Sequence, residues 1–90
     1  MIVVGYGKEE VMAELGTENE YVIQEKQLGT GHAVIVAEKA LKNKTDHVVV
    51  LYCDHPFVSS TTIQKLVEKH LSSGVKITVA TVDLPDFQDW

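Results

Sequence analysis

Short apolar runs alternate with helix-periodic stretches along this chain, and this alternation constrains its fold more than any other feature. The runs at residues 2–5, 20–24, 48–52 and 75–82 are rich in β-branched and aromatic residues, which predicts strands. Each stretch between them carries apolar residues at helical spacing. Because strands joined by helical crossovers form a mainly parallel sheet, the predicted order is β-α-β-α-β-α-β in an α/β fold.

The helices are predicted from their apolar faces and from residues suited to their ends. The first has a face formed by Val11, Met12 and Leu15, and Gly16 is expected to end it. The second begins at Thr30, a candidate N-cap, and its stripe follows i, i+3, i+4, i+7, i+8 spacing: Ala33, Val36, Ala37, Ala40 and Leu41. The third is expected to begin after Ser59 or Ser60 and to end before Gly74, with His70 as a boundary residue and a core stripe of Ile63, Leu66, Val67 and Leu71.

Length and composition limit the classes of function. Ninety residues allow one small domain at most. The net charge of -5, from 13 acidic and 8 basic residues, argues against nucleic-acid binding but not against a mononucleotide ligand. Cys53 is the single cysteine and cannot form an internal disulfide, which indicates a reducing, cytoplasmic setting. No apolar run reaches the length of a membrane span.

A glycine-rich segment follows the second predicted strand. Gly29-Thr30-Gly31 permits backbone shapes that side chains would block, and it exposes N–H groups at a helix N-terminus, which favour anions and carbonyl oxygens. Gln24 lies at the carboxyl end of the preceding strand, where ligands bind in parallel sheets. Two interpretations fit: a tight turn without a ligand, or a site where backbone groups, Thr30 and Gln24 bind a nucleotide base.

A carboxylate follows the third predicted strand. Asp54 comes after a buried-type apolar run, a position suited to holding Mg²⁺ between phosphate oxygens. The alternative is that Asp54 caps nearby backbone N–H groups. A zinc site with Cys53 and His55 is disfavoured because adjacent residues of a strand point to opposite faces. Cys53 is also disfavoured as a nucleophile because no activating base is evident.

Two segments resemble one family of enzymes. Residues 24–33, Gln-Glu-Lys-Gln-Leu-Gly-Thr-Gly-His-Ala, and residues 50–56, Val-Leu-Tyr-Cys-Asp-His-Pro, resemble the sugar-phosphate nucleotidyltransferases. The likeness is greatest to the uridylyltransferase domain of bacterial N-acetylglucosamine-1-phosphate uridylyltransferases, and residues 3–7 fit that family's third strand and turn. The resemblance implies a fragment of a Rossmann-like three-layer fold. It also implies Mg²⁺-dependent transfer of UMP from UTP to N-acetylglucosamine 1-phosphate, which releases pyrophosphate and forms a cell-wall precursor.

The resemblance also assigns roles to individual residues. It implies that Gln24, Gly29 and Thr30 contact the uracil. Tyr52 and Asp54 would lie on the sugar-phosphate side, with Asp54 as a Mg²⁺ ligand. It implies no catalytic side chain in this chain, because the reaction needs mainly positioning and charge neutralisation.

The departures from the family pattern define what is expected to be absent. Residues 1–90 are predicted to be a single partial domain that lacks the family's N-terminal glycine-rich loop, its downstream lysine and its C-terminal part. Such a fragment is expected to be inactive alone and to self-associate through exposed sheet edges. Cys53 stands where the family usually has glycine. Two alternatives stay open: a non-catalytic nucleotide-binding or interaction domain, and a nucleotidyltransferase of other base or acceptor specificity.

Overall fold

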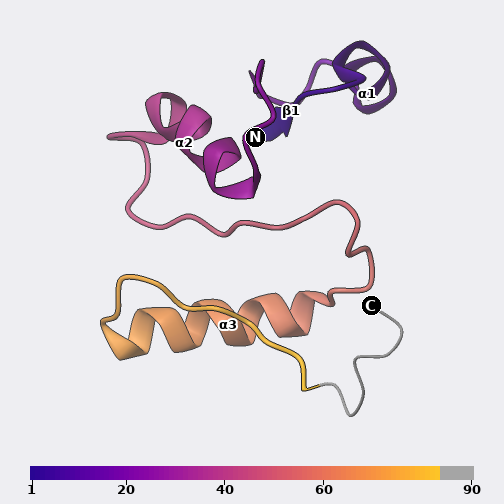
Figure 1. Cartoon of the computed structure of the whole chain (residues 1–90). Helices are drawn as coiled ribbons and strands as arrows, with labels where there is room; N and C mark the ends of the chain where they lie inside the picture. The colour runs from indigo at the N-terminus through magenta and orange to yellow at the C-terminus, as the bar shows by residue number, and fades with distance from the viewer. Residues whose placement is uncertain (84–90) are drawn as a thin grey trace. The chain divides into compact units, whose positions relative to one another are not determined.

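The computed structural model describes residues 1–83, and the last seven residues of the predicted domain lie outside that range. Its elements, in chain order, are β1 (Ile2–Val4), α1 (Lys8–Leu15), β2 (Tyr21–Ile23), α2 (Thr30–Leu41) and α3 (Ser60–Ser73), as Figure 1 shows. The predicted α/β class is confirmed. The chain divides into two compact units at residue 50, and each is described by itself below. None of the helices within residues 1–83 has the length and apolar character needed to cross a membrane.

A two-stranded parallel sheet organises the first unit. β1 and β2 pair with Ile2 opposite Tyr21 and Val4 opposite Ile23. Backbone hydrogen bonds continue the pairing at both ends, and at the carboxyl end the Gln24 N–H donates to the Val4 carbonyl at 2.7 Å. The crossover between the strands contains α1, as the sequence predicts. Gly5 and Gln24 therefore follow the two strands at the same edge of the sheet.

α2 supplies the core of the first unit by packing against both strands. Its predicted stripe is confirmed, since all five residues are buried or half-buried: Ala33, Val36, Ala37, Ala40 and Leu41. Val4 and Ala37 are the most buried, each 4% exposed. Val34 and Ile35 lie off the stripe and are 41% and 64% exposed. The alanines on the inner face of α2 let this helix approach the short sheet closely. Figure 1 shows β1 between α1 and α2.

The ends of α3 match their sequence signals, but its inner face only partly does. The Ser59 side chain is the N-cap and accepts a hydrogen bond from the Thr62 N–H at 3.2 Å. Gly74 adopts the left-handed conformation, with φ 65°, directly after the last turn. Leu71, predicted to be in the core, is 57% exposed. That prediction is wrong because the described part of this unit contains no sheet for the helix to cover.

The strands predicted at residues 48–52 and 75–82 are absent, so the observed order is β-α-β-α-α. Residues 48–52 are 45–56% exposed, and Ile77, Val79 and Val82 are 79%, 72% and 80% exposed. The reason is physical: a strand satisfies its backbone N–H and C=O groups only through a neighbouring strand. Within residues 1–83 neither run has such a neighbour, whereas β1 and β2 have each other.

Candidate functional site

A pocket of about 390 Å³ lies at the carboxyl edge of the β1–β2 sheet. It is formed by the loop after β1, the first turn of α1 and the segment after β2, and it is lined by Gly5, Tyr6, Lys8, Glu9, Ile23, Gln24, Glu25 and Gln27. Ligands bind beyond the carboxyl ends of parallel strands in folds of this class. Gln24, which is predicted to face a ligand site, lines this pocket, and Lys8 adds a cation to its lining.

The Gln24 side chain is tied to the turn that opens α2. Its Nε2 donates a hydrogen bond to the Gly29 carbonyl oxygen at 3.1 Å and lies 2.9 Å from Nδ1 of His32. The Gly29 carbonyl also accepts the Ala33 N–H at 3.2 Å, the first helical bond of α2. The structure thus brings Gln24 and Gly29 together, as expected. It adds His32, to which the sequence analysis assigns no role.

Gly29 has a backbone conformation that only glycine adopts easily. Its φ of 103° and ψ of 176° lie in a region closed to residues with a Cβ. Gly29 is the N-cap of α2, and Thr30 is the first helical residue, so the expectation that Thr30 is the cap is wrong. No side chain caps this end, and the N–H groups of residues 30–32 have no partner within the helix. They remain available as donors beside the exposed Thr30 side chain.

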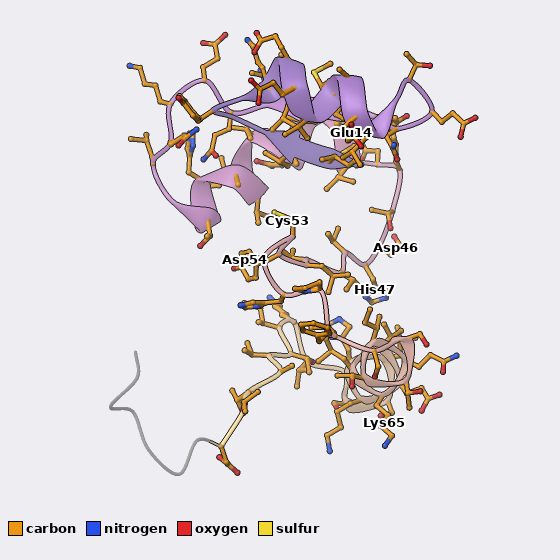
Figure 2. The ribbon with its side chains drawn as sticks, turned by 90° about the vertical axis from the view of Figure 1, so that its right-hand side faces the viewer. Glu14, Asp46, His47, Cys53, Asp54 and Lys65 are labelled. Atoms are coloured by element: carbon orange, nitrogen blue, oxygen red, sulfur yellow. The ribbon has the colours of Figure 1, made fainter. Side chains whose placement is uncertain are left out.

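Tyr52 and Asp54 lie in the second unit, on an exposed turn rather than at the end of a buried strand. The turn is closed by the His55 N–H, which donates to the Tyr52 carbonyl at 3.3 Å, and the two rings meet edge to face at 5.8 Å. Figure 2 shows Cys53 and Asp54 on this irregular stretch. Cys53 is exposed as well. The predicted strand-end geometry of Asp54 is therefore wrong, since the strand that would hold it lacks a partner.

The Asp54 carboxylate is accessible to a ligand. The side chain is 79% exposed, and its Oδ1 lies 4.0 Å from Nε2 of His55. Within residues 1–83 there is no cluster of three or more His, Cys, Asp or Glu side chains that could hold a metal ion. A lone exposed carboxylate suits Mg²⁺, which takes one or two protein carboxylates and completes its shell with water and phosphate oxygens. Gln24, Gly29 and Thr30 belong to the first unit, and Tyr52 and Asp54 to the second.

Comparison with known proteins gives consistent matches. The model of the MobA-like NTP transferase domain matches residues 1–85. The bifunctional protein GlmU of Exiguobacterium sibiricum is 42% identical over 86 residues, which are 96% of this chain and 19% of that protein. GlmU of Shouchella clausii is 45% identical over 85 residues, 94% of the chain and 19% of that protein. GlmU of Geobacillus thermodenitrificans is 43% identical over 84 residues, 93% of the chain and 18% of that protein. The chain spans about a fifth of the length of these curated relatives. No solved structure matches it.

Proposed function

The chain belongs to the family of MobA-like NTP transferase domains, and we propose that it is part of a sugar-1-phosphate uridylyltransferase. The proposed reaction transfers UMP from UTP to N-acetylglucosamine 1-phosphate. A phosphate oxygen of the sugar phosphate attacks the α-phosphorus of UTP, a new P–O bond forms, and the bond to the leaving pyrophosphate breaks. Identity of 42–45% to GlmU proteins across more than nine-tenths of the chain supports this choice of reaction.

The observation that carries the proposal is the anchored Gln24 amide beside the pocket at the carboxyl edge of the sheet. Gln24, Gly29 and Thr30 are proposed to contact the uracil. The amide of Gln24 and the unpartnered N–H groups at the start of α2 offer acceptors and donors of the kind that a pyrimidine edge requires. Because the N-cap of α2 is a glycine in an extended, positive-φ conformation, a flat base can approach that backbone closely.

Tyr52 and Asp54 are proposed to lie on the sugar-phosphate side. Asp54 would hold Mg²⁺, and its exposed, singly placed carboxylate suits a metal that shares its remaining positions with water and phosphates. When bound, the metal would neutralise charge on the phosphates. Tyr52 is proposed to help to orient the sugar phosphate through its hydroxyl, which is a donor and acceptor.

The chain is much shorter than the curated relatives that it matches. Since the chain spans about a fifth of its curated relatives, the reaction is proposed for a longer protein that contains it, and the 90-residue chain alone is expected to be inactive. UTP and the sugar 1-phosphate are the proposed small-molecule partners, without nucleic acid or membrane. Self-association and the cytoplasmic setting stay predictions.

The test is pyrophosphate release from UTP and N-acetylglucosamine 1-phosphate by the longer protein, with and without Mg²⁺. Asp54→Ala is expected to lose most of the activity. Asp46→Ala is the matched control, because Asp46 is another exposed loop carboxylate without a proposed role. Equal activity of the two variants would overturn the role of Asp54. Pyrophosphate release with another nucleoside triphosphate but not with UTP would overturn the uridylyl assignment.

A further inference from the structure

Both hydrogens of the Gln24 side-chain amide are already engaged. Nε2 lies 3.1 Å from the Gly29 carbonyl oxygen and 2.9 Å from Nδ1 of His32, so that each of its two N–H donors has one acceptor. The primary amide of glutamine has two N–H donors and one acceptor oxygen. Within residues 1–83, Oε1 of Gln24 accepts no hydrogen bond. The amide therefore presents to a ligand an acceptor and no spare donor.

The Gly29 carbonyl favours one of the two possible orientations of this amide. A carbonyl oxygen can only accept, so Nε2 rather than Oε1 must lie against it. The carbonyl itself is held in place because it accepts the Ala33 N–H in the first turn of α2. A turned amide would set its oxygen against this carbonyl oxygen and lose the bond.

The same orientation determines the proton position on His32. Nε2 of Gln24 is a donor, so Nδ1 of His32 must be its acceptor and carry no proton. The imidazole is then the neutral tautomer with its proton on Nε2. With a proton on Nδ1, two donors would face each other at 2.9 Å.

We propose that His32, as the Nε2–H tautomer, is a positioning residue that acts together with the Gly29 carbonyl to hold the Gln24 amide with Oε1 free for the nucleobase. His32 does not touch the base in this arrangement and acts through Gln24. The inference rests on the proposed function, because it assigns the selection between bases at the same site. An acceptor at this position favours a base edge with a ring N–H, such as the imide of uracil. It disfavours cytosine, whose corresponding ring nitrogen is itself an acceptor.

The first test reads the tautomer without any nucleotide. In the ¹⁵N-labelled 90-residue chain, in mildly alkaline buffer, ring correlation spectra of His32 are expected to show a proton on Nε2 and none on Nδ1. His32→Leu keeps much of the volume but removes the acceptor, and His32→Asn places an acceptor oxygen where Nδ1 stood. The two Nε2 proton signals of Gln24 are expected to shift in the leucine variant and to stay near the wild-type positions in the asparagine variant. A proton on Nδ1, or Gln24 signals unchanged by His32→Leu, would overturn the inference.

The second test measures base selection by titrating UTP and CTP into the longer protein that contains this chain and into its His32→Leu and His32→Asn variants, with binding followed by the amide signals of the first turn of α2. Wild type is expected to bind UTP more tightly than CTP. His32→Leu is expected to reduce that preference by about fivefold to tenfold, the value of one ordinary hydrogen bond, and His32→Asn to keep it. An unchanged preference in His32→Leu would overturn the inference alone. Binding of neither nucleotide by wild type would overturn the proposed function of this site, and the tautomer spectra would still decide the positioning role.

Discussion

Gly29→Ala is the substitution whose effect follows most directly from the structure. At φ 103° and ψ 176°, Gly29 occupies a region that residues with a Cβ avoid. A Cβ built at this position meets nothing within 4 Å. The penalty therefore comes from the local backbone alone and cannot be relieved by moving a neighbouring side chain. Alanine must either accept the strain or change the start of α2.

The expected cost is about 1–3 kcal/mol, the range for a residue forced into a sparsely populated backbone region. This corresponds to a reduction of about 5- to 150-fold in the folding equilibrium of the first unit. If the backbone relaxes instead, the Gly29 carbonyl turns away from the Ala33 N–H and from Nε2 of Gln24, and both hydrogen bonds weaken. Either route lowers the stability of the first turn of α2.

Gly31→Ala is the matched control, two residues further along. Gly31 lies inside α2 and has no positive φ, and a Cβ there also meets nothing within 4 Å. Alanine is expected to stabilise the helix by about 0.5–1 kcal/mol, because glycine loses more backbone entropy on folding. The same chemical change is thus expected to act with opposite sign at two neighbouring glycines.

The assay combines urea unfolding, followed by far-ultraviolet circular dichroism, with hydrogen exchange of the Ala33 amide. Gly29→Ala should lower the urea midpoint and speed that exchange, and Gly31→Ala should do the reverse. A Gly29→Ala variant as stable as wild type would refute the reasoning, since it would mean that the positive φ is not required. A loss of stability of equal size in both variants would refute it as well, since it would point to the added methyl group rather than to the backbone.

Three further predictions concern a helix cap, a side-chain hydrogen bond and self-association. Ser59→Ala removes the N-cap of α3 and should cost about 0.5–2 kcal/mol in urea unfolding, whereas Ser60→Ala in the first turn should be neutral or slightly stabilising; equal effects would contradict the cap. Tyr21→Phe removes the 2.6 Å hydrogen bond to the Gly16 carbonyl and should cost about 0.5–1.5 kcal/mol, and an unchanged urea midpoint would count against that bond. The chain should self-associate through the exposed apolar run at residues 48–52, so that the sedimentation coefficient of the wild type rises with concentration and that of Val50→Lys rises less. A compact wild-type monomer at high concentration would disprove this.

Local features of this chain were predictable because their causes are local. The stripe of α2, the cap at Ser59 and the stop at Gly74 each depend on residues within one or two turns. The first two strands were also predictable, because a single crossover brings them together. In each case the sequence contains both the signal and the partner that the signal needs.

The errors share a different cause. The runs at 48–52 and 75–82 have strand composition, but pairing is a property of two segments, and within residues 1–83 neither run is paired with another strand. The placement of Asp54 depended on one of those strands and was wrong for the same reason. The sequence analysis gave His32 no role because its hydrogen-bond partner, Gln24, lies eight residues earlier in the chain. The turn that brings the two side chains together depends on the backbone conformation of Gly29.

The division of the chain at residue 50 bears on its synthesis. The first unit contains β1, β2 and α2, which packs against both strands. It also contains the residues at the start of α2 and before it: Gln24, Gly29, Thr30 and His32. Chains emerge from the ribosome N-terminus first, and compact units generally fold as they appear. The residues proposed to contact the base therefore precede the Asp54 turn in the order of synthesis, together with the strands and the helix that position them. The first unit can therefore begin to fold before the second is complete.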